Sequence, residues 1–302
     1  MHEPSDPSHP PRELLSGYEF QTLHGLALAR ARARVWLEQA GMKGTVLLAS
    51  EGVNFSLFGS AKQLDAWLLW LDEHLDCASP VLNRQAVTES PFQRLKVRIR
   101  PEIVTFDRSS DTDSLAPGVA VLPQDWNALI EQQDIQFVDT RNAYEVRLGT
   151  FEHARNPATD SFTDFQAWAL ASLDRDRPVA MFCTGGVRCE KASDWLKREG
   201  FDQVYQLHGG ILSYLETVPE VDSKWRGECF VFDDRVALNH DLKPTGRTIC
   251  LACRMPTEDE HDLCPDCAVK IRRDANSGLA EKVRQLRLNQ SRRPAEAEAM
   301  PE

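Results

Sequence analysis

The sequence has 302 residues and is 42% hydrophobic, which is enough to bury two or three domain cores. Lys and Arg number 35 against 46 Asp and Glu, a formal net charge of -11 that argues against a general nucleic-acid coat protein but leaves room for local basic faces. No apolar run approaches the ~20 residues of a membrane helix, and the polar N-terminus lacks a secretory signal, so we expect a cytoplasmic protein with no membrane partner. In such a reducing compartment, the eight cysteines are expected to serve catalysis or metal binding rather than disulfides.

The first 105 residues predict a disordered tail followed by one α+β domain. Residues 1–15 are polar and rich in proline, as disordered tails are. From Tyr18 onward, strand and helix patterns follow in the order β-α-β-β-α-β, with Gly41 as a helix C-terminal cap and Ser60 as a helix N-terminal cap. This order predicts a ferredoxin-like domain over residues 16–105.

The last strand pattern of this domain, in FQRLKVRIRPEIV, carries alternating cations. Side chains alternate between the two faces of a strand, so Leu95, Val97 and Ile99 share the core face. The opposite face carries four cations with no acid between them: Arg94, Lys96, Arg98 and Arg100. We favour contact with an RNA backbone for this stripe, and the alternative is a solvated outer face of the sheet.

The rest of the chain predicts a linker, an α/β domain and a cysteine-rich end. Residues 106–118 have the Ser, Asp, Pro and Gly composition of a linker. The apolar runs VAVL, IQFVDT, PVAMFC and VYQL then alternate with helical patterns, which predicts a parallel α/β domain over residues 119–227. Residues 228–302 are polar, hold five of the eight cysteines and end in a basic tail.

The stretch PVAMFCTGGVRCEKAS predicts a reactive cysteine. An apolar strand delivers Cys183 to the edge where open α/β sheets bind ligands, and the N-terminus of the next helix, with Arg188, would stabilise a thiolate there. Gly185 and Gly186 would let backbone N–H groups face an anion. The loop has six residues, one fewer than in cysteine phosphatases, which suits a single sulfur: Cys183, Thr184, Gly185, Gly186, Val187 and Arg188. The alternative is an inert, buried core cysteine.

Cys189 falls in the first turn of the predicted helix. It can be a resolving thiol that closes a disulfide with Cys183, or a residue that only packs, and the sequence leaves both open. Cys77 and Cys229 belong to no motif and are interpreted as packing residues.

A second group of cysteines has the spacing of a metal site. Two CxxC pairs are separated by ten residues: Cys250, Cys253, Cys264 and Cys267. Paired CxxC turns are typical of tetrahedral zinc ligation, so we expect a closed, structural zinc site in a small zinc-ribbon-like segment. Four reduced thiols without metal are the alternative.

Several long motifs, in order, resemble a known family. FVDTRNAYEVRLGTFEHARN and CTGGVRCEKASDWLKREGFDQVYQLHGGI are similar to a rhodanese domain, with Cys183 at its active cysteine and Asp139, Arg141 and Glu145 in its first motif. Together with KGTVLLASEGVNFSL, FQRLKVRIRPEIV and GECFVFDDRVAL, they make residues 18–267 resemble the oxygen-dependent tRNA uridine hydroxylases.

The resemblance implies an oxidoreductase that converts the wobble uridine (uridine 34) of tRNA to 5-hydroxyuridine. It implies tRNA as partner, molecular oxygen as co-substrate and Cys183 as the essential residue, described in the family as a persulfide carrier. We expect no nucleotide or flavin cofactor, because no GxGxxG motif follows a strand. The loop alone does not exclude a thiosulfate or persulfide sulfurtransferase, and a non-enzymatic RNA-binding or redox scaffold is a third hypothesis.

Overall fold

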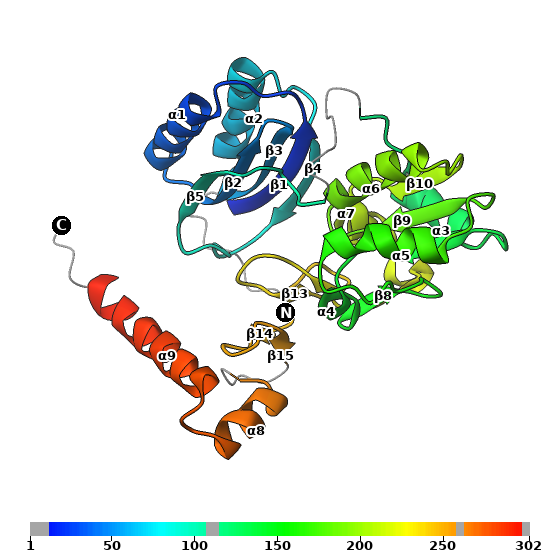
Figure 1. The fold of residues 1–302 in the computed structure, drawn as a ribbon. Helices are drawn as coiled ribbons and strands as arrows, with labels where there is room; N and C mark the ends of the chain where they lie inside the picture. Colours follow the sequence, from blue (N-terminus) through cyan, green and yellow to red (C-terminus); the bar gives the residue numbers. More distant parts are fainter. Residues whose placement is uncertain (1–11, 107–114, 258–262, 298–302) are drawn as a thin grey trace.

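A computed structural model describes residues 12–106, 115–257 and 263–297. Two sheet-containing domains lie beside each other, and a smaller C-terminal part lies below them, from which helix α9 (Gly278–Ala297) projects (Figure 1). Residues 1–11 of the predicted tail and residues 107–114 of the predicted linker lie outside the described residues.

The N-terminal domain is a five-stranded sheet in the order β4-β1-β3-β2-β5. The first four strands pair antiparallel in the ferredoxin-like order, and β5 adds to β2 in parallel. The strands are β1 Arg12–Phe20, β2 Lys43–Ala49, β3 Gly52–Ser60, β4 Val81–Ala86 and β5 Leu95–Ile99. Helices α1 (Leu26–Gln39) and α2 (Ala61–Leu75) contribute Leu37, Trp67 and Leu71 to one core beneath the sheet.

The sequence pattern placed the caps of these helices correctly. The Ser60 hydroxyl accepts from the backbone N–H of Gln63, whose side-chain oxygen accepts from the Ser60 N–H at 2.8 Å, which is a capping box. Gly41 follows α1 with a φ of 66°, a left-handed conformation that favours glycine.

Two predictions for this domain are wrong in detail. Strand β1 begins at Arg12 and buries Leu14 and Leu15, so residues 12–15 belong to the sheet rather than to a disordered tail. The strand that completes the ferredoxin-like order is β4. Its VLNRQA sequence has no apolar alternation, since its buried positions hold Asn83 and Gln85, which are hydrogen-bonded to each other at 2.8 Å. The basic segment forms the additional edge strand β5 instead.

The central domain is a four-stranded parallel sheet, as predicted, and its strand order is β6-β10-β9-β7. Its strands are β6 Val119–Val121, β7 Gln136–Asp139, β9 Val179–Phe182 and β10 Val204–Leu207. Helices α5 (Phe165–Ser172) and α6 (Val187–Arg198) cover one face, and α3 (Pro123–Ile130) and α7 (Gly210–Thr217) cover the other. Phe106, which was predicted to lie in the linker, is buried in this domain and stacks on Phe162 with ring centroids 4.5 Å apart.

Short elements complete the fold. They are helix α4 Ala143–Val146, 3-10 helices η2 Phe162–Asp164 and η3 Glu220–Asp222, strands β8 Gly149–Phe151 and β11 Trp225–Gly227, hairpin strands β12 Cys229–Phe230 and β13 Ala237–Leu238, hairpin strands β14 Thr248–Ile249 and β15 Pro256–Thr257, and helix α8 Pro265–Arg273. No helix in the described part of the chain is both long and apolar enough to cross a membrane.

The two large domains meet through a buried charged contact. The Lys191 ammonium on α6 lies 2.7 Å from a carboxylate oxygen of Glu51 and 2.7 Å from one of Glu102, and all three side chains are almost fully buried. Both acids belong to the N-terminal half of the chain. Because an unpaired buried charge is costly, this triad fixes the N-terminal domain against the helix that follows Cys183.

Candidate active site

Cys183 directly follows β9 and is 1% exposed. The backbone N–H of Gly186 donates to its Sγ at 3.1 Å. Gly186 precedes α6 with a φ of 98°, and a Cβ there would lie 2.8 Å from the Tyr18 hydroxyl. A glycine is therefore required at Gly186, whereas a Cβ on Gly185 would meet no atom within 4 Å, so the predicted need for two glycines holds at only one of them.

The N-terminus of α7 supports the loop from the other side. The N–H groups of Ile211 and Leu212 donate to the carbonyl oxygens of Cys183 and Thr184 at 2.9 and 3.1 Å. Gly210 has a φ of 67°, and a Cβ there would lie 2.5 Å from the Cys183 carbonyl oxygen. Two helix starts thus hold the backbone of this cradle (residues 183–188) in place.

The cradle stabilises a thiolate at Cys183. Burial alone would raise the pKa of Cys183, but a hydrogen bond from the Cys189 thiol, the Arg188 charge and backbone N–H groups together lower it to about 6. Burial and the neighbouring Cys183 hold the pKa of Cys189 well above its usual range. At neutral pH, the two sulfurs therefore differ: Cys183 is a thiolate and Cys189 is a neutral hydrogen-bond donor.

Cys189 lies against Cys183 and is fully buried. The Thr140 hydroxyl is 3.6 Å from the Cys189 Sγ. In this structure, Cys189 is a free thiol next to Cys183. Cys189 is packed in the core and also lies next to Cys183, so its two expected roles, packing residue and resolving thiol, both stay predictions.

Arg188 is held by Glu145 on α4. Two hydrogen bonds of 2.7 and 2.8 Å join the guanidinium to the carboxylate, and a third of 3.2 Å reaches the Thr184 hydroxyl. Burial would raise the pKa of Glu145, but Arg188 outweighs it, and the pKa is lowered. Arg188 is thus a rigid part of the cradle wall, because three hydrogen bonds already hold its guanidinium against protein groups.

Asp139 and Arg141 form a second buried pair behind the cradle. The Arg141 guanidinium lies 2.7 Å from the Asp139 carboxylate, and neither side chain is exposed. Arg141 also donates to the Gly149 carbonyl oxygen at 2.6 Å and lies over the Trp225 ring at 5.1 Å. These contacts tie the end of β7 to β8 and β11, so this pair braces the site from below.

The N-terminal domain covers the cradle with a residue that sequence reasoning missed. Tyr18 on β1 packs beside Val187, and its hydroxyl donates to Glu190 at 3.2 Å. Burial, the Glu190 carboxylate and the nearby thiols raise the pKa of Tyr18 far above its ordinary value, so it remains a neutral donor. No local pattern in YEF predicts this contact, because 172 residues separate Tyr18 from Glu190 in the sequence.

A second missed residue, Phe232, lies at the rim of the cradle. Its ring centroid is 5.8 Å from the Arg188 guanidinium carbon, and the ring is in edge contact with Phe230. Phe230 in turn contacts the ring of Tyr144. No local pattern indicated this difference, because strand alternation would place residues 230 and 232 on the same face, whereas the structure buries Phe230 and exposes Phe232.

The four cysteines of the CxxC pairs come together as predicted. All four Sγ atoms lie within 4.8 Å of one another, and those of Cys253 and Cys264 are 3.8 Å apart. A tetrahedron with Zn–S bonds of about 2.3 Å requires sulfurs about 3.8 Å apart. Around the first pair, the Cys250 N–H donates to Met255 and the Arg254 N–H to Cys250, both at 2.9 Å, which forms a tight turn. The donor set fits a structural metal ion.

Comparison with known proteins assigns both large domains. Residues 12–103 match the UPF0176 acylphosphatase-like domain, and residues 122–217 match the rhodanese-like domain. The chain therefore has the two-domain architecture of the UPF0176 family. Its order of domains is that of the oxygen-dependent tRNA uridine hydroxylases that the sequence resembles, and its rhodanese domain carries Cys183 at the loop.

Each of the following solved structures matches about a third of the chain. A rhodanese-related protein from Thermoplasma volcanium is 22% identical over 33% of this chain and 95% of its own, with a TM-score of 0.29. A rhodanese-like domain protein from Staphylococcus aureus is 23% identical over 32% of this chain and 90% of its own, with a TM-score of 0.28. An acylphosphatase from Coxiella burnetii is 18% identical over 29% of this chain and 94% of its own, with a TM-score of 0.23.

The basic strand of the UPF0176 domain lies away from the cradle. The predicted stripe lies on the open face of β5, where its four cations are all exposed: Arg94, Lys96, Arg98 and Arg100. Leu95 and Val97 pack against the core as expected, but Ile99 is 39% exposed because the strand ends there. β5 is an edge strand, so its far side is open to a partner.

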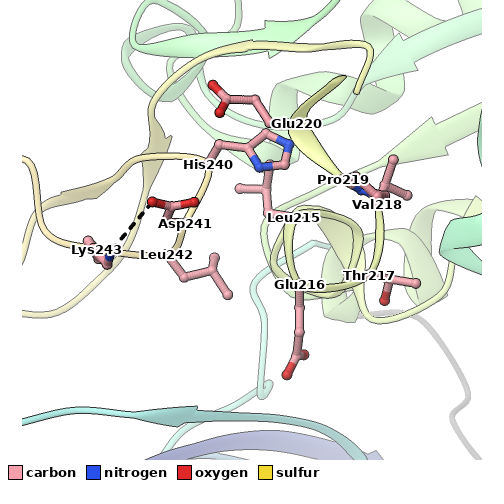
Figure 2. Close-up of a pocket in the computed structure, with 10 residues that line it drawn as sticks. All are labelled: Leu215, Glu216, Thr217, Val218, Pro219, Glu220, His240, Asp241, Leu242 and Lys243. Carbon is pink, nitrogen blue, oxygen red and sulfur yellow. Dashed lines mark hydrogen bonds and ion pairs between the residues drawn. The ribbon is translucent and has the colours of Figure 1, made fainter. Parts of the chain in front are cut away.

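A separate groove of about 580 Å³ lies between the C-terminal end of α7 and residues 240–243 (Figure 2). His240 and Glu220 both line it, and the Nε2 atom of His240 is buried without a hydrogen-bond partner in the described part of the chain. No cradle residue lines this groove, so it is distinct from the Cys183 site.

Proposed function

We propose that this protein hydroxylates uridine 34 of tRNA to 5-hydroxyuridine with molecular oxygen, and that Cys183 is its essential residue. The observation that carries the proposal is the union, in one chain, of a UPF0176 domain with a rhodanese domain, packed together over the Cys183 cradle. A thiolate that persists at neutral pH is a suitable nucleophile or sulfur carrier for attack on a nucleobase.

The cover that Tyr18 places over the cradle favours this function over a plain sulfurtransferase. An enzyme that takes sulfur from thiosulfate needs only a small open pocket, whereas here the N-terminal domain contributes a buried residue to the site. That same domain carries the exposed cations of β5. A large polyanion such as tRNA would contact both domains at once, which gives the second domain a role.

The experiment compares tRNA nucleosides by mass spectrometry in cells with and without the gene, grown under oxygen-18 gas. We expect 5-hydroxyuridine to disappear on deletion, and in wild-type cells to carry one heavy oxygen atom. Unchanged nucleosides on deletion, together with robust cyanide-dependent turnover of thiosulfate by the pure protein, would replace the proposal with the sulfurtransferase function.

A further inference from the structure

One aromatic ring at the cradle rim is exposed although its neighbours are buried. Phe232 is 67% exposed, whereas Phe230, two residues earlier, is 7% exposed. The two rings meet edge to face with centroids 5.1 Å apart. The Phe232 ring therefore packs against the buried ring of Phe230 and is otherwise open to solvent.

The ring is held in a fixed position against the cradle. The Arg188 guanidinium carbon lies 5.8 Å from its centroid, within the range of a cation–π contact. Arg188 is itself immobilised by Glu145 and donates to Thr184 in the cradle. One side chain thus separates the exposed ring from the loop of Cys183, and a ring that is already ordered loses little entropy when a ligand covers it.

The segment that carries Phe232 also touches the N-terminal domain. The N–H of Asp234 donates to the Pro91 carbonyl oxygen at 3.1 Å, and Arg235 donates to the Gln85 side chain at 2.8 Å. Pro91 is three residues before Arg94, where the basic stripe begins. Phe232 accordingly lies between the cradle and the part of the chain that leads into β5.

The charges near the ring favour a nucleobase over a phosphate. Asp233 is paired with Arg235 at 2.7 Å, but Asp234 is exposed and would repel an anion at this place. Phosphates are better accommodated on the cations of β5, while the uncharged ring face suits a flat, neutral base. Aromatic rings beside a basic surface are the usual means of holding unstacked RNA bases.

We propose that Phe232 is the stacking platform for the RNA base that is presented to Cys183. This inference rests on the proposed function, because it names the residue that receives the nucleobase of the tRNA substrate. The neighbouring Arg188 fixes the ring, and the β5 cations hold the adjoining backbone.

The test uses the full chain and a synthetic anticodon stem–loop with the fluorescent base pyrrolocytosine in place of uridine 34. Stacking on an aromatic ring quenches this base. We expect quenching with wild type and Phe232→Trp, and loss of quenching with Phe232→Leu and Phe232→Ala, with affinity reduced on the order of ten-fold. The dependence of affinity on salt should stay the same, because no phosphate contact is removed. Leu69→Ala, which trims a side chain that is 71% exposed on α2, should behave as wild type.

The outcomes separate this inference from the proposed function. Wild-type quenching and affinity in both Phe232→Ala and Phe232→Leu would overturn the platform while leaving the hydroxylase intact. Failure of the wild-type protein to bind any anticodon stem–loop would overturn both. In cells, Phe232→Trp should retain 5-hydroxyuridine and Phe232→Ala should lower it.

Discussion

Cys183 and Cys189 show how one helix start gives two thiols opposite properties. Both are buried near the charge of Arg188, but Cys183 also accepts hydrogen bonds from the backbone N–H of Gly186 and from the Cys189 thiol. Cys189 donates to it, so the pair shares one proton.

The thiolate of Cys183 should be visible in a pH titration. The difference in thiolate absorbance between wild type and Cys183→Ala should rise with a midpoint near pH 6, because the pKa is about 6. Cys189→Ala removes the strongest of the contacts that lower it, so the midpoint should move up, and Cys189→Ser should move it less. A midpoint above pH 8 in wild type would contradict the conclusion that the cradle lowers the pKa of Cys183.

The same shift has a consequence for stability. The folded pKa of about 6 lies below the ordinary value of 9.0, so ionised Cys183 stabilises the fold fully above pH 9. This contribution falls as the pH drops from 9 to 6 and is absent below 6. Cys183→Ala should therefore flatten the dependence of unfolding free energy on pH within that window.

At this scale, the sequence predicted the residues that are close together along the chain. Cys183, Arg188 and the glycine of the turn were readable because a strand, a loop and a helix start follow one another within a few residues. Tyr18 and Phe232 were not, because each reaches the cradle from a different part of the chain, and a single aromatic residue has no spacing to recognise.

Among the elements, β5 combines a regular alternation with an unexpected place in the sheet. The alternation of cations and apolar residues in RLKVRIR predicted its two faces correctly at Leu95 and Val97. The position of the strand was predicted wrongly, since β4 fills the expected place with polar side chains that bond to each other. Pairing partners depend on the whole sheet, and periodicity reports only which face is buried.

If β5 contacts RNA, its cations should set the salt dependence of binding. Arg98→Ala should weaken tRNA binding and reduce the slope of log affinity against log salt by about one. Arg34→Ala on α1 is the matched control, since it removes an exposed arginine that pairs with Glu38. Equal slopes in both variants and wild type would remove β5 from the interface.

The four-cysteine cluster should hold one metal ion per chain. Metal analysis of the purified full chain should find zinc, and Cys250→Ser should lose it while keeping the thiolate absorbance of Cys183, because the two sites share no residue. Cys77→Ser, at a buried cysteine outside the cluster, should keep the metal. Metal content that does not depend on Cys250 would refute this assignment.

For the whole molecule, the contact between the two large domains is the feature that makes one site from two folds. On the helix that follows the cradle, Lys191 forms ion pairs with two carboxylates of the N-terminal domain. Tyr18 of the same domain covers the cradle loop. The domain order was predictable from element patterns and the family resemblance. The contact between the domains was not, because Lys191 lies in EKAS, a polar stretch that is typical of an exposed helix.

Breaking this contact should destabilise the molecule substantially. Lys191→Met leaves Glu51 and Glu102 buried beside each other without their cation, which should cost about 3–5 kcal/mol of unfolding free energy. Lys197→Met, on the exposed side of the same helix, is the control. Urea unfolding measures both, and an equal small loss in the two variants would show that the triad does not hold the domains together.

The most direct test of the account is the tRNA nucleoside profile of deletion cells complemented with single-cysteine variants. Wild type and Cys77→Ala should restore 5-hydroxyuridine at position 34, because Cys77 lies in the core of the N-terminal domain. Cys183→Ala should accumulate as folded protein and restore none. Normal 5-hydroxyuridine with Cys183→Ala would contradict the central claim that this thiol performs the modification.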